Sequence, residues 1–400
     1  MTLRITAVAL LMVCAAPLVA QRTLQHDRSV VSQVRIDMRD LGYPPADVIP
    51  SGESAVRALA VAPNGALYGI TSGKRSHIFA LFPQHGYVQP LGYLKGVTSV
   101  GRSLVISANG DVYIGAAGPG GRLYRYTPKR DEDTPIRTDE ECGAADLGAP
   151  VPEGGIHALA IDRRSGIIYG VAAPGGEFFS YDVAKARFTV HGRIAERNIP
   201  GERFERYKNL GRAIVLDGEG RAYVSGEDGA IFRFDVTRQA LEKLPVAAPT
   251  VRGREPYNGV DAWVRAETGQ LYGGTSDGYL FRLDPKSATM ENLGKPLNQY
   301  RIRGLVSGRN GKLYGVGGDD DEMARLFSYE PARGVYEMLG MIDVNRRPYY
   351  SWHAYVIDAV AIGKDDTIYL GQSERKSKLY LYHPEPRVLR ECAEELGTVQ

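Results

Sequence analysis

The segment Leu280-Phe281-Arg282-Leu283-Asp284-Pro285 decides the fold, because it is one of seven copies of a single pattern. Each copy has an aliphatic residue or Phe, an aromatic residue, a variable residue, an apolar residue, a mostly polar residue, and then Pro or Val. The other copies begin at Ile78, Leu123, Phe178, Ile231, Leu326 and Leu379. About ten residues before each copy lies a Tyr followed within three residues by Gly, at Tyr68, Tyr113, Tyr169, Tyr223, Tyr272, Tyr314 and Tyr369. A period of roughly 40–50 residues made of short β-rich runs indicates a propeller.

The first repeat shows what each unit should form. Val56 to Ala62 is apolar at alternate positions, Pro63-Asn64-Gly65 turns the chain, and three further short runs end at Ile70, Phe82 and Leu91. Alternation and turn residues at these spacings predict a four-stranded antiparallel meander. Such a sheet buries both faces only by stacking on its neighbours. We therefore predict an all-β, seven-bladed β-propeller of four-stranded antiparallel blades.

Four hundred residues could form about two or three ordinary domains. The repeat nevertheless runs without a break, which predicts a single propeller over residues 34–384, preceded by a lead at 21–33 and followed by a tail at 385–400. Leu-Gly usually ends the fourth strand, and one extra copy occurs at Leu41-Gly42. We therefore expect Val34 to Leu41 to be the outer strand of the last blade, closing the ring and removing an exposed edge.

Residues 1–20 are typical of a signal peptide. Arg4 is followed by an apolar run from Ile5 to Val13 and by small residues up to Ala20, where we expect cleavage. A lipid anchor on Cys14 is the alternative. No other stretch is apolar over the length of a membrane span. The expected location is therefore secreted or periplasmic.

Two cysteines remain in the mature chain, Cys142 and Cys392, and they form either a disulfide or two separate thiols. Two acidic segments are expected to be solvated loops: one around Asp131–Asp133 and Asp139–Glu141, the other at Asp319–Glu322. The second lacks the glycine of a calcium-binding loop.

A ring of charged residues is predicted at the axis. The position eleven residues before each repeat Tyr, or twelve in the third unit, should open the inner strand beside the central channel. These positions hold Arg57, Arg102, His157, Arg212, Asp261 or Val260, Arg303 and Asp358. The charges either pair around the ring and fill the channel, or the surplus arginines bind a carboxylate, phosphate or sulfate, which a guanidinium can hold in bidentate fashion.

The loops that enter the inner strands carry aromatic, basic and amide side chains, which either form a lid or line a carbohydrate groove. Candidate binding residues there are Arg254, Asn258, Trp352 and, at the start of a third strand on the same face, His77. Together with the axial arginines they favour an acidic polysaccharide or oligosaccharide. A net charge of +2 gives no general reason to expect nucleic acid as a partner. We also expect the protein to be a monomer.

Such a face could cleave a uronic-acid glycan by β-elimination. Arg57, Arg102, Arg212 and Arg303 would neutralise the carboxylate, and a base and an acid would move the protons. Candidate bases are His157 or His353, and candidate acids are Tyr257 or Tyr207. No cofactor or metal is expected, because no close His or Cys pair has metal-binding spacing. The sequence lacks a nucleophile elbow, and no P-loop or dinucleotide fingerprint stands in a strand-turn-helix setting.

Over residues 34–384 the chain resembles the secreted seven-bladed propellers that act on acidic polysaccharides, such as the ulvan lyases and rhamnosyl-glucuronate lyases. The resemblance lies in the blade repeats and in the site composition. It implies polysaccharide lyase activity, and it also implies potential metal ligands at His77, His157, His353, Asp261 and Asp358. The alternative function is a non-catalytic propeller that binds glycan or protein, because one fold hosts many functions.

Overall fold

The computed structural model describes residues 49–384 except 83–86, 119, 130–136, 196–209, 320, 347–349 and 375–376. The described elements are strands, together with two 3₁₀ turns, η3 (Glu227–Gly229) and η4 (Glu255–Tyr257). Within these residues no helix has the length and apolar character needed to cross a membrane. The fold is therefore all-β, as predicted.

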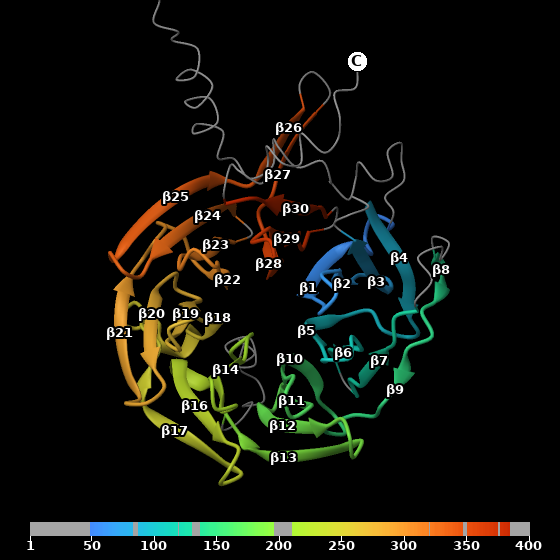
Figure 1. Cartoon of the computed structure of the whole chain (residues 1–400), viewed down its shortest axis with the longest axis horizontal. Coiled ribbons are helices and arrows are strands. Elements are labelled where there is room, and N and C mark those ends of the chain that lie inside the picture. Colours follow the sequence, from blue (N-terminus) through green and yellow to red (C-terminus); the bar gives the residue numbers. More distant parts are fainter. Residues whose placement is uncertain are drawn as a thin grey trace, which may run out of the picture.

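Most sheets are antiparallel meanders of four strands, and a single parallel pairing, Ala158 with Arg102, joins the second and third of them into one eight-stranded sheet. Figure 1 shows the sheets arranged around a central axis with the first strand of each meander innermost. The first sheet contains β1 (Ala55–Val61), β2 (Leu67–Ser72), β3 (Ser76–Phe82) and β4 (Tyr87–Leu94). The second contains β5 (Val100–Ile106), β6 (Val112–Ala116), β7 (Leu123–Tyr126) and β9 (Ala145–Asp146). The third contains β10 (Gly155–Asp162), β11 (Ile167–Ala173), β12 (Glu177–Asp182) and β13 (Arg187–Arg193).

The second half of the chain continues the pattern. The fourth sheet contains β14 (Val215–Leu216), β15 (Ala222–Ser225), β16 (Ala230–Asp235) and β17 (Ala240–Ala247). The fifth contains β18 (Val260–Arg265), β19 (Leu271–Thr275), β20 (Leu280–Asp284) and β21 (Thr289–Gly294). The sixth contains β22 (Ile302–Ser307), β23 (Leu313–Asp319), β24 (Glu322–Glu330) and β25 (Val335–Met341). A hairpin of β26 (Asp343–Arg346) and β27 (Tyr350–His353) precedes a three-stranded sheet of β28 (Ile357–Ile362), β29 (Ile368–Gln372) and β30 (Leu379–Tyr382).

The predicted Tyr-Gly motif has a steric cause. Gly273 pairs with Phe281 on the next strand, and a Cβ added to Gly273 would lie 2.2 Å from a carbon of that ring. The Phe ring of β20 therefore lies across β19 at a position that only glycine can occupy without a clash. The same pairing recurs at Gly69 and Phe79, Gly170 and Phe179, and Gly315 and Phe327.

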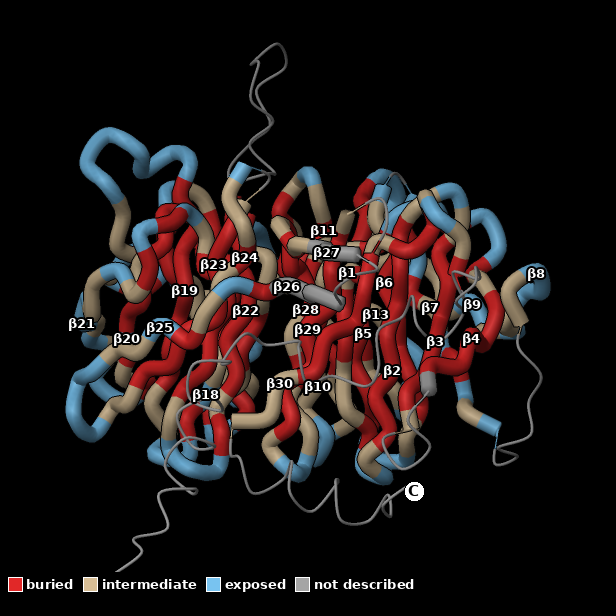
Figure 2. The backbone as a smooth tube through the Cα atoms, turned by 90° about the horizontal axis from the view of Figure 1, so that it is seen from above, coloured by how far each residue is buried: buried red, intermediate tan, exposed pale blue. Residues whose placement is uncertain are grey.

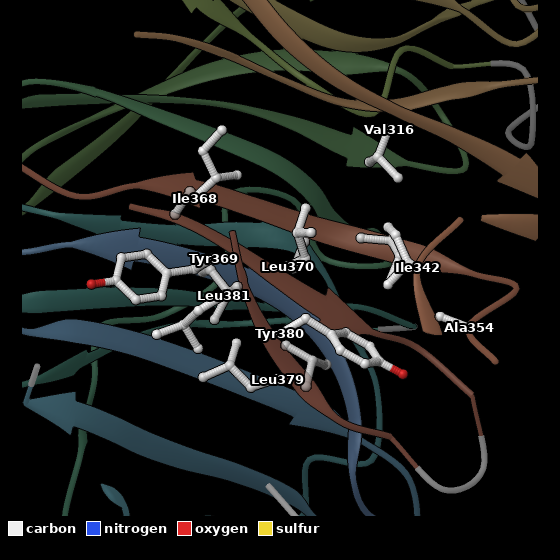
Figure 3. Packing of buried hydrophobic residues seen from close by; sticks show 14 of the residues in the cluster. Val316, Ile342, Ala354, Ile368, Tyr369, Leu370, Leu379, Tyr380 and Leu381 are labelled. Atoms are coloured by element: carbon white, nitrogen blue, oxygen red, sulfur yellow. The ribbon is translucent and has the colours of Figure 1, made fainter. Parts of the chain in front are cut away.

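Neighbouring sheets bury their faces against each other, as the repeat predicted. The Tyr of each repeat is buried, and Figure 2 shows buried residues along the strands and exposed ones in the loops. One apolar cluster joins the last sheet to its neighbours: it contains Tyr369 and Tyr380 together with Val316 of β23 and Ile342, and Tyr380 lies on the side of Ile342 (Figure 3). This cluster also contains Val56 of β1, and the Ser373 hydroxyl donates a hydrogen bond to the Val56 carbonyl at 2.6 Å. The first and last sheets are thus in direct contact.

One segment differs from its prediction. Asp139–Glu141, expected in a solvated loop, is part of β8 (Arg137–Glu141), which pairs parallel to β4 of the first sheet, while Asp131–Asp133 lies outside the described residues. Its acidic residues are largely exposed, so the segment is solvated, but it is a strand on the edge of a neighbouring sheet. Cys142 follows directly, and burial raises the pKa of its thiol. The predicted signal peptide, the strand from Val34 to Leu41 and Cys392 lie outside the described residues.

Candidate functional site: an axial arginine pocket

The inner strands carry their axial residues on β-bulges. The pairing register slips at Arg57, His157, Asp261, Arg303 and Asp358, each of which lies between two paired neighbours. Arg102 lies in the corresponding irregular stretch of β5, and Arg212 precedes β14. A bulge redirects a side chain out of the normal alternation. Because of the extra residue, the charged side chain at the bulge need not point into the buried face of the strand.

The same bulge decides between the two candidates on β18. Val260 is buried in an apolar cluster with Tyr223 and Phe281. The Asp261 carboxylate instead receives a hydrogen bond from Arg301 Nη1 at 2.8 Å. Asp261 is therefore the axial residue of this strand.

Asp358 is the centre of the axial cluster. Its carboxylate accepts hydrogen bonds from Arg57 Nη1 at 2.6 Å, Arg303 Nη1 at 2.7 Å and Arg102 Nη2 at 3.3 Å. Arg212 Nη1 lies 3.7 Å from Asp358 Oδ1. Burial opposes ionisation of Asp358, but these guanidinium groups outweigh it and hold its pKa well below the usual value. Asp358 is therefore a carboxylate at neutral pH.

Two further residues complete the cluster. Arg303 donates hydrogen bonds to Asp319 and to the Gly318 carbonyl, and Arg301 Nε lies 3.4 Å from Asp319 Oδ2. Asp319 was expected in a solvated loop, but here it ends β23 and pairs with arginine. Its place at the end of a second strand, on the same face as the axial residues, is the feature outside the repeat count that points to this role. Among the described residues five arginines thus surround three aspartates, and Glu374 of the same cavity reduces the excess to one positive charge.

A cavity of about 660 Å³ opens on this cluster. Its lining residues are Arg57, Arg212, Arg301, Arg303, Asp319, Val356, Asp358, Ser373 and Glu374. The two most exposed guanidinium side chains are Arg57, at 36%, and Arg212, at 26%. Within the described part of the chain the Arg212 guanidinium donates no hydrogen bond, and its nearest carboxylate oxygens are 3.7 and 3.8 Å away. These two side chains can therefore donate to a bound anion.

His157 lies at the same level but does not line the cavity. Burial and the nearby Arg212 guanidinium lower its pKa to about 4, so its ring is neutral at pH 7. Its Nε2 is buried and has no hydrogen-bond partner among the residues that the structure describes. A base with so low a pKa accepts a proton with little driving force. This environment suits a structural imidazole better than the predicted general base.

The low pKa of His157 makes stability depend on pH. The unfolded chain binds a proton near the ordinary value of 6.5, whereas the folded protein does so only near 4. Stability is thus lost as pH falls from 6.5 toward 4, by about 2–3 kcal/mol at pH 4.5. We expect His157→Gln to show a smaller drop in the free energy of urea unfolding between pH 7 and pH 4.5 than the unsubstituted protein. Equal drops would contradict this assignment.

Several predicted site residues lie apart from the cavity. His77 is fully buried in β3, with its Nε2 2.6 Å from Glu53 Oε2. Asn258 is also buried, and its Nδ2 donates to the Ala248 carbonyl at 3.0 Å. Arg254 pairs with Asp277 at 2.8 Å. None of the three lines the axial cavity.

The remaining candidates are placed as follows. Tyr257 is exposed on η4, and His353 is the last residue of β27. Neither contributes to the cavity lining. Tyr207 and the side chain of Trp352 lie outside the described residues. Over the described ranges, no three His, Cys, Asp or Glu side chains are grouped to hold a metal ion.

Comparison with known proteins supports the fold alone. No protein-family model matches the chain, and no curated protein matches it in sequence. Among solved structures, it resembles virginiamycin B lyase from Staphylococcus aureus with a TM-score of 0.59 at 13% identity, covering 82% of this chain and 95% of that one. It also resembles the extracellular domain of a putative hybrid two-component system from B. thetaiotaomicron, with a TM-score of 0.57 at 17% identity, covering 84% of this chain and 39% of that one.

A third likeness is to a chain of the mitotic checkpoint complex, with a TM-score of 0.60 at 12% identity, covering 96% of this chain and 100% of that one. Proteins this distant share an architecture and not necessarily an activity. The structural neighbours, together with the antiparallel sheets, support a β-propeller.

Proposed function

We propose that the protein is a secreted or periplasmic propeller that binds an acidic, uronic-acid glycan in the axial pocket. The observation that carries this proposal is the pair of accessible guanidinium groups, Arg57 and Arg212, in a pocket where arginines outnumber carboxylates by one when Glu374 is included. A carboxylate accepts paired N–H donors from arginine, and a charge-assisted contact of this kind is strong.

The pocket also fits the hydroxyl groups of a sugar acid. Asp319 and Glu374 line the same cavity as Arg57 and Arg212. Their carboxylate oxygens accept hydrogen bonds, so they suit neutral O–H donors beside the anionic group. They also repel ligands with a high density of negative charge. A singly charged sugar acid fits this combination better than a phosphate.

We propose binding as the main function, with β-elimination of a linked uronic-acid glycan as a second reaction that a separate absorbance measurement reads. Binding needs only the arginines, whereas cleavage needs a base next to the ligand. Of the four predicted catalytic residues, the three that the structure describes are absent from the cavity lining.

We also infer that the ring has seven blades and that Val34 to Leu41 closes it. Seven copies of the repeat support the count. The sheet of β28, β29 and β30 has three strands in the described part, whereas the preceding sheets have a fourth. The position beside β30 therefore suits an added outer strand.

Titration calorimetry with glucuronate or galacturonate, and with glucose as the neutral control, tests the binding. We expect the acids to bind and glucose not to bind. Arg212→Ala should weaken acid binding by about 10–100-fold, since a hydrogen bond to a charged group contributes about 1.5–3 kcal/mol. Arg309→Ala, which removes an exposed arginine paired with Asp366, is the matched control and should bind normally. Equal affinity for glucose, or full affinity in Arg212→Ala, would overturn the proposal. Cleavage needs a linked substrate, because β-elimination breaks the bond to the glycosyl group on C4 and the free sugar acids have none. A rise in ultraviolet absorbance during incubation with a 4-linked uronic-acid oligosaccharide would show that cleavage.

A further inference from the structure

Two tyrosines stand out by their exposure. Of the aromatic side chains that the structure describes, only Tyr257 and Tyr300 are exposed, at 44% and 47%. The Tyr of every repeat is buried by comparison. Aromatic rings left in water next to polar groups are typical of binding surfaces.

Tyr300 adjoins a pocket residue in the chain, and Tyr257 lies on the loop that leads into the neighbouring inner strand. Tyr300 directly precedes Arg301, whose side chain lines the cavity and donates to Asp261. Arg301 has a φ of +58°, a left-handed conformation that is uncommon outside glycine. Its amide is held by the Ser276 carbonyl at 3.1 Å. Tyr257 is on η4, which precedes β18, the neighbour of β22 in the ring (Figure 1).

The surface around Tyr300 is built from fixed side chains. Asp277 is fully buried and accepts hydrogen bonds from Arg254 Nε at 2.8 Å, the Val251 amide at 3.1 Å and the Thr250 hydroxyl. This contact holds Arg254, whose guanidinium carbon lies 5.3 Å from the centre of the Tyr300 ring. A loop tied to a buried carboxylate is ordered before any ligand arrives, which lowers the entropy cost of binding.

A second cation completes the surface. Lys295 Nζ lies 5.3 Å from the centre of the Tyr300 ring and 5.1 Å from that of Tyr279. Cations at these distances are attracted to the ring faces. Lys295 and Arg254 are also exposed, so they can reach an anion in solvent.

We propose that Arg254, Tyr257, Lys295 and Tyr300 form a second subsite, the outer subsite, which holds another residue of the acidic glycan bound in the axial pocket. The inference rests on the proposed function. The two cations suit a second acidic group, and the exposed edges of the tyrosine rings suit the apolar side of a sugar. Because Tyr300 and the pocket residue Arg301 are adjacent in the chain, one ligand spans both sites. The ligand is therefore an oligosaccharide with repeated acidic groups.

Chain length tests the outer subsite. Calorimetry compares a uronic-acid monosaccharide with a tetrasaccharide of the same acid, and we expect the tetrasaccharide to bind about tenfold more tightly. Tyr300→Ala should remove most of this gain, since loss of a central aromatic contact costs about tenfold in affinity, and should leave monosaccharide binding unchanged. Met338→Ala, an exposed site on the outer strand β25, is the control and should keep the full gain.

The outcomes separate the two proposals. If the monosaccharide binds but Tyr300→Ala retains the chain-length gain, the outer subsite is wrong and the axial pocket stands. If neither ligand binds the unsubstituted protein, the axial pocket and the outer subsite both fail. A tetraglutamate peptide that binds as tightly as the tetrasaccharide, with the same loss in Tyr300→Ala, would overturn the assignment to a sugar. Circular dichroism of Tyr300→Ala checks that the sheets are intact.

Discussion

Replacing Asp358 with Asn is expected to lower the free energy of unfolding by about 3–5 kcal/mol, the cost of removing one partner from a buried ion pair. The variant keeps the shape of the side chain and removes its charge. Arg57, Arg102 and Arg303 would then point at a neutral amide in a buried site. The carboxylate charge that offsets the repulsion among these three arginines would then be absent. Urea unfolding followed by fluorescence measures the change.

Two companion variants identify the cause. Asp139→Asn removes an exposed partner of Arg75 and should shift stability by less than about 0.5 kcal/mol, as expected for a surface ion pair. Asp358→Asn combined with Arg303→Met should recover part of the loss, because the uncompensated cation leaves together with its partner. An unfolding midpoint for Asp358→Asn equal to that of the unsubstituted protein would show that the cluster does not depend on this carboxylate.

The axial residues could be predicted because they occupy one position of a repeat. Counting back from the Tyr of each unit found Arg57, Arg102, His157, Arg303 and Asp358, and the structure brings them to one level. Their pairing could not be predicted in the same way, since a bulge changes where a side chain points without changing the local sequence pattern. At β18 the count allowed either Val260 or Asp261, and only the observed slip in register separates them.

Other members of the cluster lie off the repeat. Arg301 enters the pocket from a residue with positive φ just before β22, and Asp319 enters from the end of β23. Neither position carries a charged residue in every unit, so the repeat gave no signal. Strand β8 was missed for a related reason. Its exposed acidic residues show no apolar alternation, and it pairs with a strand of another sheet.

The repeat is most informative at the crossing of the second and third strands, where Gly273→Ala is expected to destabilise the protein by about 2–3 kcal/mol. The new methyl group would lie 2.2 Å from a carbon of the buried Phe281 ring, well inside contact distance. Either the ring or β19 must move, and overpacking of this kind typically costs about 1–3 kcal/mol. Thermal and urea unfolding give the measurement.

A double-mutant cycle shows whether the ring is the cause. Phe281→Leu alone should destabilise the protein, because it leaves space across β19, but in the Gly273→Ala background it should restore stability, because the smaller side chain makes room for the methyl group. Gly218→Ala is the control: its Cβ would meet only an arginine side-chain end at 3.5 Å, so a change below about 0.5 kcal/mol is expected. Additive effects of the two substitutions would mean that the Tyr-Gly motif has some cause other than the ring that crosses it. A favourable coupling would show that the repeated glycine is present because the repeated phenylalanine needs its space.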